Sequence, residues 1–117
     1  MLGQLLIGLI ALLHVYILVL EMFLWDKPYG LKAFGNSLEK AQLTKVMAQN
    51  QGLYNGFLAA GLFWSLLAPA SYALAIANFF LGCVLIAGIY GGLTASKKII
   101  YIQAIPAFIA LILVNIF

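Results

Sequence analysis

Four long runs of apolar residues, separated by shorter polar segments, make up most of the chain. The runs cover residues 2–24, 49–67, 71–93 and 98–117. Crossing about 30 Å of hydrocarbon takes roughly 20 residues of α-helix, so each run is long enough to cross a bilayer once. The pattern therefore predicts an all-α fold, an integral membrane four-helix bundle, with residues 1–117 forming a single transmembrane domain.

The longest polar segment, residues 25–48, connects the first run to the second. The stretch "KPYG" near its start predicts a turn. Asn36 followed by Glu39 is typical of a capping box that opens a helix. We therefore expect a short interfacial helix over Leu38–Met47, which either lies on the membrane surface or continues into the second run. A tight turn at "APAS" and the stretch "GGLTASKK" connect the remaining runs.

Composition and lysine placement indicate the compartment and the orientation. The chain is 66% hydrophobic and only 8% charged, which is too little charge to cover a soluble domain. All six lysines lie in the first and third connections, which the positive-inside rule places in the cytoplasm, with both termini outside. We expect a multi-pass protein of the cell (plasma) membrane whose first run is a retained span and not a cleaved signal peptide.

Several functional classes are excluded by what the chain lacks. A net charge of +3 from scattered lysines, without arginine, does not predict a nucleic-acid interface. Cys83 is the single cysteine and His14 the single histidine, so neither a disulfide nor a metal site is predicted. We expect no cofactor. The expected partners are the lipid bilayer, a small-molecule or lipid-like ligand, and a second copy of the chain in a homo-oligomer.

The first run carries two ionisable groups where a lipid-spanning helix usually has none. Glu21 follows His14 by seven residues and Trp25 follows by eleven, which places all three on one stripe of a helix. His14 and Glu21 are separated by about 10 Å along the helix axis, so they cannot hydrogen-bond each other directly. Because a charge in hydrocarbon costs about 2.5–3.5 kcal/mol or more, Glu21 is a candidate functional group that binds a proton or a ligand.

Polar side chains of the other runs are predicted at the depth of Glu21. The second run opens with Asn50, Gln51, Tyr54 and Asn55, which are candidates to line the same site. Secondary candidates on the third and fourth runs are Tyr90, Tyr101 and Gln103. A row of small residues, Gly52, Gly56 and Ala60, predicts close packing between two helices.

The stretches "HVYILVLEMFLW" and "NQGLYNGFLAAGL" resemble a known family over essentially the whole chain. They are similar to the small bacterial membrane proteins of the domain-of-unknown-function family 1304. The resemblance implies a four-span membrane protein, with motif positions at His14, Glu21, Met22 and Trp25, then at Asn50, Gln51, Gly52, Tyr54, Asn55 and Gly56. It implies no particular activity.

Three functional hypotheses fit these residues. We expect a small-solute or proton-coupled transporter, with Glu21 as its protonatable group and Trp25, Tyr54 and Asn55 lining a pocket. One alternative is a non-catalytic scaffold or partner subunit in which the polar residues only stabilise the helices. The other is a membrane enzyme that acts on a lipid-like substrate through His14 and Glu21. The lack of a nucleophile motif or phosphate loop argues against the enzyme.

Overall fold

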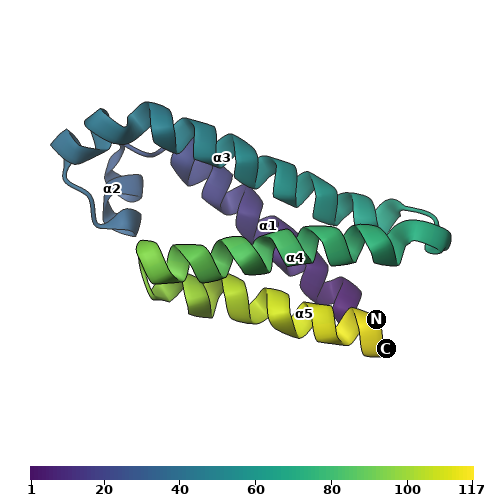
Figure 1. The fold of residues 1–117 in the computed structure, drawn as a ribbon. Helices are drawn as coiled ribbons and strands as arrows, with labels where there is room; N and C mark the ends of the chain where they lie inside the picture. Colours follow the sequence, from purple (N-terminus) through teal and green to yellow (C-terminus); the bar gives the residue numbers. More distant parts are fainter. The chain divides into compact units, whose positions relative to one another are not determined.

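The computed structural model describes residues 1–117, and all of its regular structure is helical. The helices in chain order are α1 (Leu2–Met22), α2 (Pro28–Phe34), α3 (Leu38–Leu67), α4 (Ala70–Thr94), the π-helical segment η1 (Ile100–Ala104) and α5 (Ile105–Ile116) (Figure 1). The prediction of an all-α fold is confirmed.

The chain divides into two compact units. The first, which we call the terminal unit, consists of residues 1–12 and 58–117 and contains both ends of the chain. The second, the hairpin unit, consists of residues 13–57, that is, the second half of α1, all of α2 and the first part of α3.

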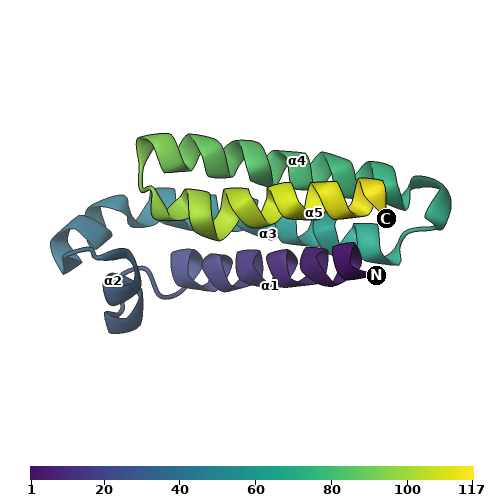
Figure 2. The same ribbon diagram turned by 90° about the horizontal axis from the view of Figure 1, so that it is seen from below.

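The terminal unit is built around one apolar core to which four helical segments contribute. Its buried side chains come from the start of α1, the end of α3, α4 and α5, and include Ile7, Leu62, Leu81, Val84, Ala107 and Ala110. In this unit α4 lies side by side with η1 and α5, and the two chain ends lie together (Figures 1 and 2). Gly88 lets α4 approach closely, since a Cβ atom there would lie 2.9 Å from the backbone nitrogen of Ala104.

In the hairpin unit, α2 is packed against the segment that directly follows α1 through a glycine. A Cβ atom at Gly30 would overlap the carbonyl oxygen of Leu24, so only glycine fits at this position. Gly35 ends α2 in the left-handed conformation, with φ of 66°, a backbone geometry that favours glycine. The chain then turns directly into α3.

Two helices, α1 and α4, are long and apolar enough to cross a membrane, judged by length and composition. The other two predicted spans do not meet this condition. The apolar helix at the C-terminal end covers 17 residues, Ile100–Ile116. Helix α3 is 30 residues long, but its first half is polar and the start of its apolar half includes Asn50, Gln51 and Asn55.

In the connection between the first and second runs the structure decides one open prediction and corrects two others. The helix expected over Leu38–Met47 continues into the second run, because α3 runs without a break to Leu67, with no proline or glycine to stop it before Gly52. The "KPYG" stretch is not a turn, since Pro28 occupies the first turn of α2, where its missing N–H costs nothing. Ser37, and not Asn36, caps α3: its hydroxyl accepts the backbone N–H of Lys40 at 3.2 Å.

Candidate functional site

The centre of the site is a direct contact between the first and third helices of the hairpin unit. The side-chain amide of Asn55 donates to Oε1 of Glu21 at 2.6 Å. Glu21 belongs to the last turn of α1 and is only 4% exposed, although it is a carboxylate on a strongly apolar helix. The contact links residues 34 positions apart, so it depends on how closely α1 and α3 pack.

Two glycines of α3 make this close packing feasible. A Cβ atom at Gly52 would lie 2.6 Å from Cγ of Met22 and 3.1 Å from Cβ of Glu21. One turn further along, a Cβ atom at Gly56 would lie 2.6 Å from Cδ1 of Leu18. Because these glycines flank Asn55, its short side chain reaches the carboxylate. Ala60, the third member of the predicted row, is exposed and belongs to the terminal unit.

His14 is completely buried, with 0% exposure, two helical turns before Glu21 on α1. Their spacing of seven residues corresponds to about 10 Å along the axis. The two ionisable groups of α1 are therefore both buried, and the hydrogen bond that Glu21 accepts comes from Asn55 on α3. No group of three or more His, Cys, Asp or Glu side chains forms a metal-binding cluster in the chain.

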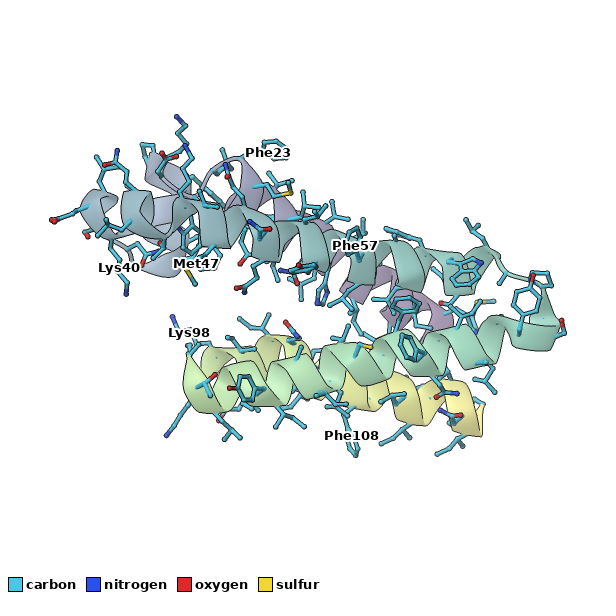
Figure 3. The ribbon with its side chains drawn as sticks, turned by 45° about the horizontal axis from the view of Figure 1, so that its top comes forward. Phe23, Lys40, Met47, Phe57, Lys98 and Phe108 are labelled. Carbon is cyan, nitrogen blue, oxygen red and sulfur yellow. The ribbon has the colours of Figure 1, made fainter.

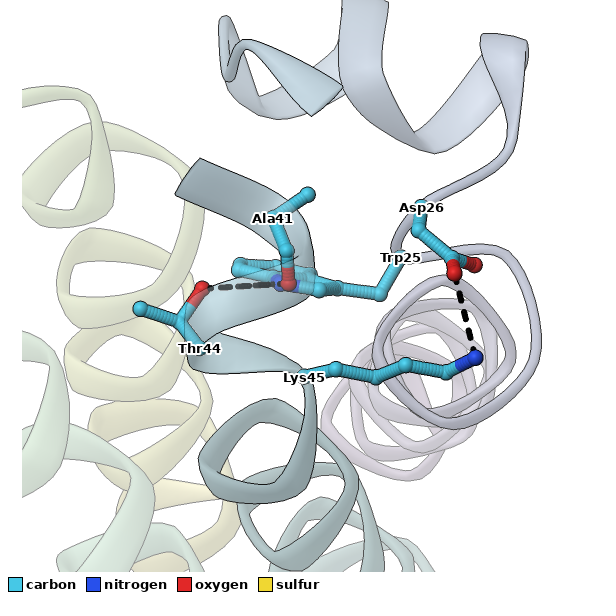
Figure 4. A network of polar contacts seen from close by, with 5 residues as sticks. All are labelled: Trp25, Asp26, Ala41, Thr44 and Lys45. Atoms are coloured by element: carbon cyan, nitrogen blue, oxygen red, sulfur yellow. Dashed lines mark hydrogen bonds and ion pairs between the residues drawn. The ribbon is translucent and has the colours of Figure 1, made fainter. Parts of the chain in front are cut away.

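The structure places Trp25 outside the helical stripe to which the sequence assigns it. The last turn of α1 loosens, with the N–H groups of Phe23 and Leu24 both bonded to the carbonyl of Val19, and the helix ends at Met22. The Trp25 indole N–H instead donates to Oγ1 of Thr44 at 3.1 Å (Figure 4). Its ring lies against Phe34 of α2, with 4.8 Å between ring centroids.

An ion pair beside Trp25 also joins this connection to α3. Nζ of Lys45 lies 3.1 Å from Oδ2 of Asp26 (Figure 4). The ammonium donates a hydrogen bond to the carboxylate and thereby lowers the pKa of Asp26. Neither this pair nor the Trp25–Thr44 bond was predicted from the sequence. Each joins residues 19 positions apart, and no local spacing signals such a contact.

The remaining candidates on α3 do not meet Glu21. Asn50 and Gln51 are exposed, and the Asn50 amide donates to the carbonyl of Val46 in its own helix at 2.8 Å. Tyr54 is 61% exposed and its ring is tilted against Phe57. Of the polar residues that open the second run, the structure thus brings Asn55 to the carboxylate.

The secondary candidates lie in the terminal unit. Tyr90 and Tyr101 are exposed, at 70% and 69%. The amide of Gln103, in the π-helical segment, donates to the carbonyl of Val84 on α4 at 3.0 Å. A third polar contact that was not predicted from the sequence joins α4 to α5: the amides of Asn78 and Asn115 exchange two hydrogen bonds, of 3.1 and 2.6 Å.

The terminal unit also contains a cavity of about 190 Å³. Its polar lining comes from Gln4 on α1 and Ser65 on α3, and the rest of the lining is mostly aliphatic. The Ser65 hydroxyl donates to the carbonyl of Leu62 in its own helix at 2.6 Å. None of the residues predicted to form the site lines this cavity.

These features describe an all-helical, strongly apolar chain with a buried acid–amide contact between two helices. The chain belongs to the family of proteins of unknown function named DUF1304, whose family model matches residues 8–115. This confirms the resemblance of the two motifs. The chain is also similar to the uncharacterized protein YpaA of Lactococcus lactis subsp. lactis (strain IL1403), at 34% identity over 106 residues, which cover 89% of this chain and 88% of that protein. No solved structure matches the chain.

Proposed function

We propose that the protein is a four-span protein of the cell membrane that works as a small-solute or proton-coupled transporter, with Glu21 as its protonatable group. The observation that carries the proposal is the buried Glu21 carboxylate on an apolar helix, held by the amide of Asn55 and by no lysine. The Asn55 amide donates one hydrogen bond to the carboxylate but carries no charge. A proton or a cationic solute must therefore compensate the carboxylate, and exchange between the two is the basis of coupled transport.

Exposed apolar surface supports the membrane placement. Within the most apolar stretches of α1 and α4, only 33% and 28% of the residues are buried, whereas the core helix of a soluble protein is mostly buried. Large side chains such as Phe57 and Phe108 are 55% and 54% exposed (Figure 3). Soluble proteins rarely expose apolar side chains so extensively, and a bilayer would cover them.

Lysine placement supports the orientation. Lys40, near the start of α3, and Lys98, in the turn after α4, are both exposed (Figure 3). The chain ends, which carry no lysine, lie together in the terminal unit. Two chain ends on the same side of a membrane are consistent with an even number of membrane crossings. We assign α1, the apolar half of α3, α4, and η1 with α5 as the four spans, with the lysine-bearing connections in the cytoplasm.

The transport proposal is tested with the full-length chain in proteoliposomes. A pH gradient is imposed, and the uptake of a panel of radiolabelled small cations, amino acids and sugars is compared with that of protein-free vesicles. We expect gradient-dependent uptake of at least one cation, loss of that uptake in Glu21→Gln, and reduced uptake in Asn55→Ala. Asp26→Asn is the matched control, because it removes a carboxylate from the connection outside the spans and should leave uptake unchanged.

Thermal unfolding of the same variants separates transport from a purely structural role. If Glu21 only stabilises the helices, Glu21→Gln lowers the unfolding temperature and any uptake in proportion. If it is the coupling group, the variant keeps its stability and loses gradient-dependent uptake. Unchanged uptake in Glu21→Gln would refute the proposal.

A further inference from the structure

One face of α1 is both apolar and exposed along the hairpin unit. Tyr16, Val19 and Phe23 follow one another at helical spacing and are 46%, 37% and 62% exposed. In the membrane placement proposed above this face contacts lipid. The inference below rests on that placement and is independent of transport.

A pair of tyrosine hydroxyls lies on this face. The hydroxyl oxygen of Tyr16 is 2.5 Å from that of Tyr29 on α2, and Tyr29 is itself 57% exposed. When one hydroxyl donates to the other, the accepting hydroxyl still has its own hydrogen to donate to a third group. Tyr16 lies six residues, or about 9 Å, before the end of α1, and its partner Tyr29 belongs to the connection that follows the span.

Helical geometry places a lysine of α2 on the same side of the helix as Tyr29. Gly30 is pressed against the carbonyl of Leu24, and Phe34 lies against Trp25, so these two residues mark the inner face of α2. Lys32 is rotated by about 200° from Gly30 and by only about 60° from Tyr29. It is exposed on the outer face, one turn along the helix from Tyr29.

The lysines of this region carry uncompensated charge. Asp26 is paired with Lys45 at 3.1 Å, and no ion pair involves Lys27 or Lys32, both of which are exposed. Two exposed ammonium groups of this connection and a tyrosine hydroxyl donor are therefore available to an anionic group, and a phosphate complements their charge.

We propose that Tyr16, Tyr29 and Lys32 form a binding site for the headgroup of an anionic phospholipid, with Lys27 adding charge beside it. The free tyrosine hydroxyl and the Lys32 ammonium donate to phosphate oxygens, and the acyl chains extend from the pair toward the bilayer centre. A lysine near an anionic membrane surface strengthens attraction roughly fivefold. We expect a preference of at least this size for anionic over zwitterionic lipid.

Quenching of tryptophan fluorescence by brominated lipids tests the proposal. The full-length chain carries two tryptophans. Trp64→Phe leaves Trp25, which lies against Phe34 of α2 and so reports on lipid bound next to that helix. The protein is placed in vesicles of phosphatidylcholine and phosphatidylglycerol, with bromine on the acyl chains of one lipid or the other.

We expect stronger quenching by brominated phosphatidylglycerol than by brominated phosphatidylcholine at equal mole fraction. Lys32→Gln should reduce that preference roughly fivefold. Tyr29→Phe should reduce it without any change in charge. Lys97→Gln is the matched control, because it removes the same charge from the other lysine-bearing connection and should leave the preference intact.

Four other results of this experiment would contradict the proposal, each for a different reason. Equal losses in Lys32→Gln and Lys97→Gln would mean diffuse attraction to the membrane and no site at the tyrosine pair. Equal quenching by the two lipids in the parent protein would also refute it. Loss of the preference in excess inorganic phosphate would indicate a site for free phosphate. Absence of quenching by either lipid would refute the membrane placement itself, whereas a negative transport result alone leaves the lipid site standing.

Discussion

The close approach of α1 and α3 at Gly52 leads to a quantitative prediction for Gly52→Ala. The added Cβ atom would lie 2.6 Å from Cγ of Met22, 3.1 Å from Cβ of Glu21 and 3.3 Å from the carbonyl oxygen of Leu18. Ordinary carbon contacts are about 3.5–4.0 Å, so the Met22 contact is short by about 1 Å. The Met22 side chain can rotate away, but the other two atoms are fixed by the backbone of α1, so α3 must move outward by a few tenths of an ångström.

The free-energy cost of this displacement should exceed the free energy that alanine gains over glycine from its higher helix propensity. Overpacking of this kind costs about 1–3 kcal/mol, whereas replacing glycine by alanine inside a helix returns up to about 1 kcal/mol. We expect Gly52→Ala to lower the free energy of unfolding by about 1–2 kcal/mol. It should also weaken the neighbouring Asn55–Glu21 hydrogen bond.

Gly82→Ala is the matched control for this prediction. Gly82 lies within α4, and a Cβ atom there would have nothing within 4 Å. The same chemical change should therefore leave stability unchanged or raise it by up to about 1 kcal/mol. Denaturant unfolding in detergent micelles, followed by tryptophan fluorescence, measures both variants. Equal stability of Gly52→Ala and Gly82→Ala would refute the close packing of α1 and α3.

Three further predictions follow from contacts outside this approach. Gly30→Ala should detach α2 from the segment that follows α1, because the added Cβ would overlap the carbonyl oxygen of Leu24. Proteolysis of the 25–37 connection should then accelerate, and unchanged cleavage would count against the packed α2. Lys45 lowers the pKa of Asp26 below its ordinary value of 3.8, so the pair's stabilisation should be full above that value and be lost as the pH falls through the lower folded pKa. Asp26→Asn should remove this pH dependence, and an unaltered acid unfolding profile would contradict it. Asn78→Ala should lower the free energy of unfolding by roughly 0.6–1.7 kcal/mol. Because the two amides bond each other, adding Asn115→Ala should lower it little further, whereas fully additive losses would show that the pair does not form.

The apolar helices could be predicted from sequence because their signal is local. The predicted spans at residues 2–24 and 71–93 correspond to α1, Leu2–Met22, and α4, Ala70–Thr94. The family could be recognised from the motifs that contain Glu21 and Asn55. From the sequence, Glu21 and Asn55 were expected only to lie at the same depth in the bundle. Depth alone did not distinguish Asn55 from Gln51 or Tyr54, which the structure leaves exposed.

The connection between α1 and α3 could not be predicted, because nonlocal packing determines it. Trp25 continues the periodicity of α1, yet the helix ends at Met22 and the indole bonds to Thr44. Asn36 and Ser37 are both good capping residues, and only the backbone geometry selects Ser37. The polar start of α3 was predicted either to lie on the membrane surface or to continue into the second run. The structure shows the continuous helix, and nothing in the sequence near residue 48 stops a helix.

The central claim is that Glu21 is a membrane-buried carboxyl group that exchanges a proton while hydrogen-bonded to Asn55. Infrared difference spectroscopy of the reconstituted protein on acidification measures this directly, because a newly protonated carboxyl group adds a C=O band. We predict a band that disappears in Glu21→Gln and shifts in frequency in Asn55→Ala, while the bands of Asp26 and Glu39 remain. Difference spectra that are identical in the parent protein and in Glu21→Gln would contradict the account.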